Sequence, residues 1–227
     1  MTDITLFIAP GTCSRVPTIA LEHIGVPFET RVVRFMAGEH KSAEYRRFNP
    51  KGKVPALLID GEALTENVAI LSYLATRFPE ASLLPATTDP LEKARQIADL
   101  CFCSSTLHPI VTRIRLPTFF ATPEAAPSVR ARADQAMAEY FALIDDRLAS
   151  CPWWYGDSWS AMDAYLYWVF WRVEGAEYEV TRYPHFVRHA RAMEALPTVQ
   201  RALDREDVAT RQLETEGMNF VPPAISR

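Results

Sequence analysis

The residues with the clearest chemical potential stand where a short apolar run gives way to a helical pattern. The segment from Pro10 to Arg15 places Cys13 and Ser14 at the entry of the first predicted helix. Backbone amides at such a terminus favour anions, and a thiol there can have its pKa lowered to roughly 3.5–7.5. One interpretation of Cys13 is therefore a reactive thiolate at neutral pH, and the other is a small buried side chain that only packs.

A second segment, residues 49–55 with the sequence NPKGKVP, leads into a predicted strand. A proline at the first position of a strand, opposite a helix-terminal thiol, suggests a cis Val54-Pro55 bond, although a trans proline is the more frequent case. A cis bond would turn the amide and carbonyl of Val54 outward, where they could pair with a peptide as an added strand does. The segment is therefore a candidate for peptide recognition.

A third segment, residues 64–67 with the sequence LTEN, opens the next predicted helix with a carboxylate, a side-chain amide and free backbone amides. The helix terminus could hold a ligand carboxylate while Glu66 takes an ammonium group. Such an arrangement suits a zwitterion. The simpler interpretation is that these residues only cap the helix.

The elements that must position these residues can be read from the hydrophobic pattern and from Pro and Gly. The first eighty residues predict a small α/β sheet unit, with strands at 4–8, 28–35, 54–59 and 63–64, helices at 14–24 and 66–78, and a loop or short helix at 39–48. The later chain predicts helices only, at 91–115 with a kink at Pro109, 128–149, 161–175, 184–195 and 198–207. We therefore expect an α/β domain at 1–80, a linker at 81–90 and an all-helical domain at 91–227.

Composition excludes several functions. The 227 residues carry 24 Lys plus Arg against 28 Asp plus Glu, with no basic cluster, so no nucleic-acid partner is expected. The longest apolar stretch, Ala164–Trp171, is too short for a membrane span, and the start lacks a basic leader. Four cysteines, at 13, 101, 103 and 151, match neither a disulfide scaffold nor a zinc pattern. We expect a cytoplasmic protein with reduced thiols, no metal and no membrane contact, in which Cys101 and Cys103 only pack.

Taken together, the three segments resemble the cytosolic glutathione S-transferase family. The likeness rests on Pro-Gly-x-Cys-Ser, Asn-Pro-x-Gly-x-Val-Pro-x-Leu, and Leu-Thr-Glu-x-x-Ala-Ile-x-x-Tyr-Leu at 64–74. In the second half, Ser160-Ala161-Met162-Asp163 resembles the family's capping box. The resemblance implies the glutathione transferase fold, which joins an N-terminal thioredoxin-like domain to an all-helical C-terminal domain. It also implies a homodimer with glutathione as co-substrate and a small hydrophobic electrophile as the second substrate.

The closest likeness is to the bacterial beta class, whose members carry a cysteine at the position of Cys13 and a histidine at that of His108. By this resemblance the catalytic residues are Cys13, which contacts or covalently holds the glutathione sulfur, Ser14, which can donate a hydrogen bond to it, and His108. Many members follow that histidine with lysine, where this chain has Pro109. The missing cation leaves the glycyl carboxylate of glutathione to Lys53 or Arg113.

The resemblance also implies which residues bind the tripeptide. Val54 would pair with the cysteinyl backbone, and Glu66 and Asn67 would hold the γ-glutamyl end. The full set of implied binding residues is Lys53, Val54, Pro55, Glu66, Asn67 and Arg113.

The expected activity is conjugation of the glutathione thiolate to small hydrophobic electrophiles, and three alternatives stay open. Cys13 has no resolving cysteine at C-x-x-C spacing, so a mixed disulfide with glutathione, and hence thiol–disulfide exchange or lyase chemistry, is plausible. A binding protein of the same fold without turnover is the second alternative. Isomerisation of small unsaturated acids is a weaker third.

Overall fold

The computed structural model describes residues 3–220, which form two compact units. The first contains residues 3–86 together with Ala195–Phe220, and the second contains Thr87–Glu194. The boundary between Ala86 and Thr87 falls inside the predicted linker. The last helix groups with the sheet unit, whereas the sequence assigned it to the helical domain 91–227, because its contacts are with the first helix of the chain. Residues 221–227 of that predicted domain lie outside the described residues.

The sheet of the first unit has four strands in the order β2-β1-β3-β4. These are β1 (Ile4–Ile8), β2 (Glu29–Val32), β3 (Ala56–Ile59) and β4 (Glu62–Thr65). Strand β1 pairs in parallel with β2 and antiparallel with β3, which in turn pairs antiparallel with β4. The predicted order of elements is confirmed, but β2 ends three residues earlier than expected, since Phe35–Ala37 turns into a 3-10 helix.

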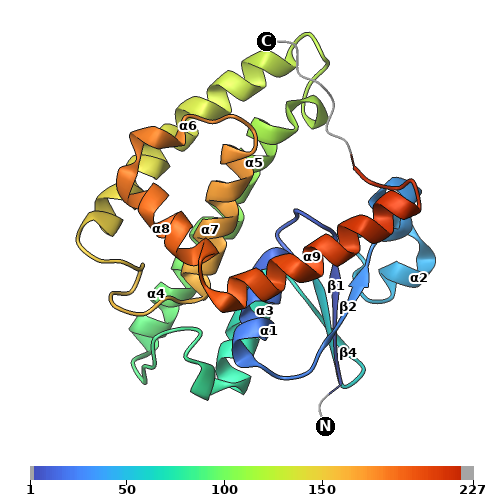
Figure 1. Cartoon of the computed structure of the whole chain (residues 1–227), viewed down its shortest axis with the longest axis horizontal. Coiled ribbons are helices and arrows are strands. Elements are labelled where there is room, and N and C mark those ends of the chain that lie inside the picture. The colour runs from blue at the N-terminus through green and yellow to red at the C-terminus, as the bar shows by residue number, and fades with distance from the viewer. Residues whose placement is uncertain (1–2, 221–227) are drawn as a thin grey trace. The chain divides into compact units, whose positions relative to one another are not determined.

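Helices α1 (Arg15–Ile24) and α3 (Asn67–Arg77) begin directly at the two chemically interesting segments. Helix α1 ends where predicted, because Gly25 adopts the left-handed conformation (φ 78°) that glycine accepts without steric cost. Helix α9 (Pro197–Thr215) lies beside α1, and Figure 1 shows it running past the sheet. The loop predicted at 39–48 contains the short helices η2 (Glu39–Lys41) and α2 (Ala43–Arg46).

The second unit is entirely helical in its regular elements. Its main helices are α4 (Pro90–Cys101), α5 (His108–Arg115), α6 (Ala126–Ala149), α7 (Ala161–Glu174) and α8 (Pro184–Glu194). Short 3-10 turns lie at Pro117–Phe119 and Val180–Arg182. No helix within residues 3–220 is long and apolar enough to cross a membrane.

The predicted single helix over 91–115 is interrupted in a different way from a simple kink at Pro109. A π-helical segment, Phe102–Leu107, separates α4 from α5, so that Pro109 stands in the first turn of a new helix. A proline in an uninterrupted α-helix would leave the Ser105 carbonyl without a donor and clash with it. The wider π turn relieves both problems, and the sequence prediction placed the break seven residues too late.

Helix α7 forms the centre of the helical unit. Its residues 161–170 are all buried, including Tyr165, Trp168 and Phe170. The ring of Phe170 stacks parallel to Phe141 of α6 at 6.4 Å between centroids and packs edge-on against Phe186 of α8 at 5.0 Å. A helix that is apolar on every side is stable only inside a packed bundle.

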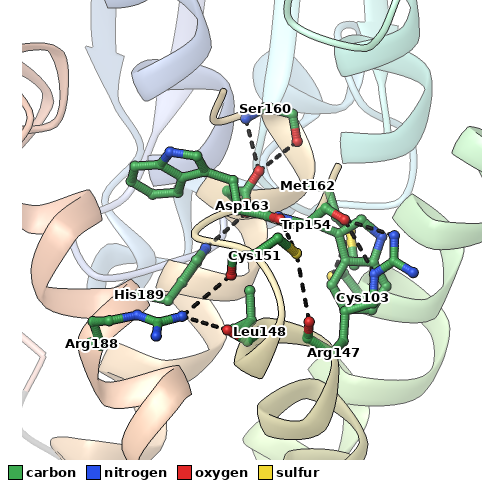
Figure 2. A network of polar contacts seen from close by, with 11 residues as sticks. Cys103, Arg147, Leu148, Cys151, Trp154, Ser160, Met162, Asp163, Arg188 and His189 are labelled. Atoms are coloured by element: carbon green, nitrogen blue, oxygen red, sulfur yellow. Dashed lines mark hydrogen bonds and ion pairs between the residues drawn. The ribbon is translucent and has the colours of Figure 1, made fainter. Parts of the chain in front are cut away.

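The predicted capping box at the start of α7 is confirmed, and it belongs to a larger buried network (Figure 2). One carboxylate oxygen of Asp163 accepts from the Ser160 N–H at 2.8 Å and the Ser160 hydroxyl at 2.7 Å. The other accepts from the Trp154 N–H at 2.7 Å and from His189 Nε2 at 2.8 Å. Because Asp163 and His189 are fully buried, this carboxylate joins the start of α7 to the preceding loop and to α8.

Cys103 shows the packing role that the sequence predicted. Its thiol is fully buried against the sulfur of Met162 at 3.6 Å, and burial raises its pKa well above the usual value. None of the four cysteines forms a disulfide with another.

Candidate active site

The Cys13 side chain lies at the N-terminus of α1 and points to the strand entry at Val54. Its thiol donates to the Val54 carbonyl with 3.7 Å between sulfur and oxygen, and the residue is 8% exposed. The Val54-Pro55 peptide bond is cis, as the position of the proline suggested. The first two segments, separated by some forty residues of chain, therefore meet at a single thiol.

Ser14 faces inward, away from this meeting point. Its hydroxyl donates to the Ala9 carbonyl at 3.2 Å, accepts from the Ala9 N–H at 3.3 Å and bonds the Thr12 hydroxyl at 2.8 Å. The Thr12 hydroxyl also donates to the Ala9 carbonyl, at 2.7 Å, so the Ser14 hydroxyl belongs to a local network with Ala9 and Thr12, and the residue is 1% exposed. Of the two adjacent candidates, Cys13 therefore carries the side chain that is directed to the strand entry.

The turn that carries Cys13 is held from the far end of the chain. Glu206 of α9 forms a bidentate ion pair with Arg15, with distances of 2.6 and 3.1 Å, and also accepts from the Gly11 N–H at 3.4 Å. Both side chains of the pair are at least nine-tenths buried. The sequence prediction missed this contact, because no local pattern links residues 191 positions apart.

The peptide group before Val54 has a fixed orientation. The Lys53 carbonyl accepts from the Tyr45 hydroxyl at 2.6 Å and from Asn49 Nδ2 at 2.7 Å. Because carbonyl and N–H of one trans peptide point in opposite directions, the Val54 N–H is turned away from these two side chains. Within residues 3–220 this N–H makes no hydrogen bond, so it is available to a peptide ligand.

Lys53 carries one of several positive charges near His40. Its side chain is exposed, and its charge is felt at His40, whose pKa is lowered first by burial and then by Lys41, Lys53 and Arg46.

Asn67 connects the third segment to the thiol turn. Its Nδ2 donates to the Cys13 carbonyl at 3.0 Å, while its Oδ1 is buried and has no hydrogen-bond partner among the described residues. The residue is only 5% exposed. An unsatisfied buried acceptor costs free energy, and a ligand ammonium or N–H would satisfy it.

Glu66, directly before α3, has a strained backbone. Its φ of 75° and ψ of 126° lie outside the regions that a side chain normally allows, and such a conformation costs about 1–3 kcal/mol. The carboxylate pairs with Lys51 at 2.6 Å, and the same Lys51 ammonium donates to Thr65 Oγ1 at 2.9 Å. Because strained residues cluster at ligand sites, Glu66 is the strongest backbone signal of a binding function here.

The remaining candidates belong to the helical unit. The ring of His108 packs edge-on against Trp168, with centroids 4.6 Å apart, and its Nδ1 lies 3.5 Å from the Tyr165 hydroxyl. Arg113 donates to the Pro109 carbonyl at 2.9 Å, and its guanidinium covers the Phe120 ring at 4.7 Å. Both side chains are engaged within their own unit.

The structure thus brings the first-unit candidates Cys13, Ser14, Lys53, Val54, Pro55, Glu66 and Asn67 to adjoining segments. Within residues 3–220, no group of three or more His, Cys, Asp or Glu side chains could hold a metal ion. The arrangement offers a thiol, an unpaired backbone N–H and a helix N-terminus with a buried acceptor. These groups can bind an extended peptide with a zwitterionic end.

Two family descriptions match the chain. The N-terminal domain of glutathione S-transferase matches residues 11–77, and the C-terminal domain matches residues 127–205. The glutathione S-transferase GstA of Escherichia coli O157:H7 is 33% identical over 204 residues, which cover 88% of this chain and 98% of that protein. A maleylacetoacetate isomerase of Pseudomonas aeruginosa is 28% identical over 81% of this chain and 87% of its own length.

Solved structures show the same likeness. A sphingomonad glutathione S-transferase in complex with glutathione superposes with a TM-score of 0.79 at 33% identity, covering 90% of this chain and 99% of that one. A bacterial beta class glutathione S-transferase of Sphingomonas chungbukensis gives a TM-score of 0.78 at 32% identity, with coverages of 89% and 98%.

Proposed function

Because the chain belongs to the glutathione S-transferase family, we propose that it conjugates the glutathione thiolate to small hydrophobic electrophiles. The observation that carries the proposal is the unsatisfied Oδ1 of Asn67, on the residue that also bonds the Cys13 carbonyl. This buried oxygen needs a hydrogen-bond donor, and its residue contacts the turn that carries Cys13. Glutathione has that donor in its γ-glutamyl ammonium group.

We expect glutathione to bind with its γ-glutamyl end at the start of α3 and its glycyl end toward Lys53. Its cysteinyl backbone would pair with the N–H and carbonyl of Val54, as an added strand does. Its γ-glutamyl ammonium would face Asn67 Oδ1 and the Glu66 carboxylate, and its γ-glutamyl carboxylate the first N–H groups of α3. Its glycyl carboxylate would lie toward Lys53, with Arg113 retained as an alternative only by resemblance.

In the reaction, the glutathione sulfur forms a bond to the electrophilic carbon. The leaving group departs with the bonding electron pair, and the thiol proton passes to solvent. Holding the sulfur at one position and desolvating it would supply most of the rate. Cys13, whose side chain points to Val54, is the side chain proposed to contact that sulfur, with Ser14 and His108 as candidates that rest on resemblance.

The helical unit is proposed to shape the electrophile pocket, and the protein is proposed to act as a homodimer in the cytoplasm. These two proposals are supported only by the chain's membership of the glutathione S-transferase family.

A second candidate function is thiol–disulfide exchange at Cys13. Cys101, Cys103 and Cys151 all belong to the helical unit, so Cys13 is the one cysteine in the described part of the first. Its thiolate would attack a glutathionylated disulfide, form Cys13–glutathione and release the other thiolate. A second glutathione thiolate would then regenerate Cys13 and leave as glutathione disulfide. Isomerisation of unsaturated acids, the activity named for the Pseudomonas relative, and binding without turnover are further alternatives.

The test combines two assays on the wild type, on Cys13→Ala and on Cys151→Ala, a control at a partly exposed thiol of the helical unit. Intact mass and peptide mapping after incubation with oxidised glutathione should find one adduct, at Cys13 alone. Turnover of 1-chloro-2,4-dinitrobenzene with glutathione should then separate the activities. Turnover retained in Cys13→Ala supports conjugation without a covalent role for that thiol, and turnover lost in Cys13→Ala shows that conjugation needs it. A wild type that forms the Cys13 adduct but does not turn over the electrophile favours exchange chemistry. An absence of glutathione binding by calorimetry would refute both.

A further inference from the structure

Lys51 holds the carboxylate that the proposed glutathione site would use. Its Nζ pairs with Glu66 Oε1 at 2.6 Å and donates to Thr65 Oγ1 at 2.9 Å. Within residues 3–220 the Glu66 carboxylate has no other hydrogen bond or ion pair. The Lys51 side chain is 50% exposed and that of Glu66 is 65% exposed. The carboxylate is therefore open to solvent but is already bound to one ammonium group.

The main chain fixes the positions from which these two side chains start. Asn49, which is 1% exposed, accepts from the Lys51 N–H on Oδ1 at 3.1 Å and from the Gly52 N–H on its carbonyl at 2.9 Å. Gly52 continues this turn with a φ of 63°, a left-handed conformation that glycine adopts without steric cost. Glu66 stands between strand β4, which is paired with β3, and the start of α3. The turn at 49–52 therefore directs Lys51 to Glu66 from a defined place.

The ion pair does not account for the strained backbone of Glu66. A side-chain-bearing residue at φ 75° costs more free energy than an exposed ion pair returns, because solvent screens the pair and both side chains lose rotamer freedom. Asn67, the next residue, has a buried Oδ1 that lacks a donor among the described residues. Two neighbouring residues thus present acceptors for the ligand ammonium of the proposed site, and Lys51 is bound to one of them.

The side chain of Lys51 ends in the same chemical group as the γ-glutamyl residue of glutathione. Each is a compact ammonium cation with three N–H donors. Two such cations at one carboxylate repel each other. Binding of the ligand ammonium to Glu66 therefore favours the departure of the Lys51 ammonium from it.

We propose that Lys51 occupies the ammonium position of the glutathione site and is displaced when the tripeptide binds. It thereby lowers the affinity for glutathione. It also weakens the selection for a free γ-glutamyl ammonium group, because Glu66 keeps a counter-charge when the ligand brings none. The proposal deepens the proposed transferase function and rests on it.

The test uses two peptides that differ only at the ammonium group. S-methylglutathione carries it, and the S-methyl form of glutaryl-cysteinylglycine has hydrogen in its place. Neither peptide can form a disulfide with Cys13. Calorimetry measures both dissociation constants for the wild type, Lys51→Gln, Lys51→Arg and Lys93→Gln, an exposed lysine of α4 that controls for the loss of one positive charge. S-methylglutathione should bind Lys51→Gln about threefold to fivefold more tightly than the wild type, the size expected for an exposed pair.

The deaminated peptide should bind Lys51→Gln no more tightly than it binds the wild type. Both peptides should stay within about twofold of the wild type in Lys51→Arg, which keeps the cation, and in Lys93→Gln. A second comparison starts from Glu66→Gln, in which the further change Lys51→Gln should alter neither dissociation constant by more than about twofold, because the carboxylate that couples them is gone.

The proposal is overturned if Lys51→Gln binds S-methylglutathione as weakly as the wild type or more weakly, or if it binds both peptides more tightly by the same factor. A wild type that binds neither peptide would refute the proposed function and this proposal with it. The two failures are therefore distinguished by the wild type alone.

Discussion

The carboxylate of Glu206 on α9 forms a buried ion pair with the guanidinium of Arg15 on α1, with 2.6 Å between Oε2 and Nη2. The same carboxylate accepts from the Gly11 N–H, so that it holds the turn on both sides of Cys13. A helix from the last thirty residues of the chain thereby fixes the conformation of a site formed at its beginning.

Replacing Glu206 should therefore destabilise the first unit. In Glu206→Gln the buried Arg15 loses its counter-charge, and breaking a buried pair costs about 3–5 kcal/mol. The measurement is the free energy of unfolding in urea. The control is Glu44→Gln, which removes an exposed partner of Arg31 and should cost about 0–1 kcal/mol. Equal losses in the two variants would show that the Arg15 pair contributes no more than a surface contact.

Ser14 should prove to be structural. Ser14→Ala leaves the Ala9 N–H without its buried partner, and should lower the unfolding free energy by about 1–3 kcal/mol. Because the hydroxyl faces inward, kcat/KM for conjugation should fall by less than about tenfold, or 1.4 kcal/mol. A large loss of kcat at unchanged stability would instead assign the sulfur contact to Ser14.

Asn67 should control glutathione affinity. Asn67→Ala removes both the proposed ammonium acceptor and the bond to the Cys13 carbonyl, so the dissociation constant for glutathione should rise by about tenfold, the effect of one lost hydrogen bond. Calorimetry provides the measurement, with Thr76→Ala as a control on the same helix, where the hydroxyl bonds only the Ser72 carbonyl. Unchanged affinity in Asn67→Ala would refute the proposed orientation of the γ-glutamyl end.

Replacing Asp163 should lower the free energy of unfolding far more than removing the Ser160 hydroxyl of the capping box. Ser160→Ala removes one hydroxyl contact and should cost about 0.5–2 kcal/mol. Asp163→Ala leaves four buried donors unsatisfied, among them His189, and should cost at least about 3 kcal/mol. Urea unfolding checks the order, with the exposed Asp146→Ala as the control. Equal costs for Asp163→Ala and Ser160→Ala would mean that the network has no role beyond the cap.

Tyr45 should make stability depend on alkaline pH. Burial raises the pKa of its hydroxyl, which donates to the Lys53 carbonyl. A group whose pKa is raised on folding stabilises the protein below its unfolded pKa, about 10 for tyrosine, and that contribution is lost as the pH rises above it. The measurement is the urea midpoint of unfolding at roughly one-unit steps of pH from about 8 to 11. As the pH rises, the midpoint should fall less steeply in Tyr45→Phe than in the wild type. Parallel curves would show that the pKa of Tyr45 does not differ between the folded and the unfolded chain.

Much of the first unit could be predicted because its signals are local. Gly25 ends a helix, Asp60-Gly61 makes a hairpin turn with φ of 49° and 87°, and alternating or continuous apolar runs mark the strands. The capping box at Ser160 is likewise a four-residue pattern. The break before Pro109 was misplaced because a π turn has no sequence signature and depends on how the helix packs.

The amino-acid sequence by itself determined the family and the order of the main elements, and it made Cys13 a candidate thiol, because each of these depends on residues close together in the chain. Only the tertiary structure decided that Ser14, the neighbour of that thiol, faces inward and that the carboxylate of Glu206 holds the turn. Those outcomes depend on contacts between Ser14 and Ala9 and between Arg15 and Glu206. Burial and pairing are properties of the packed chain, and no local pattern encodes them.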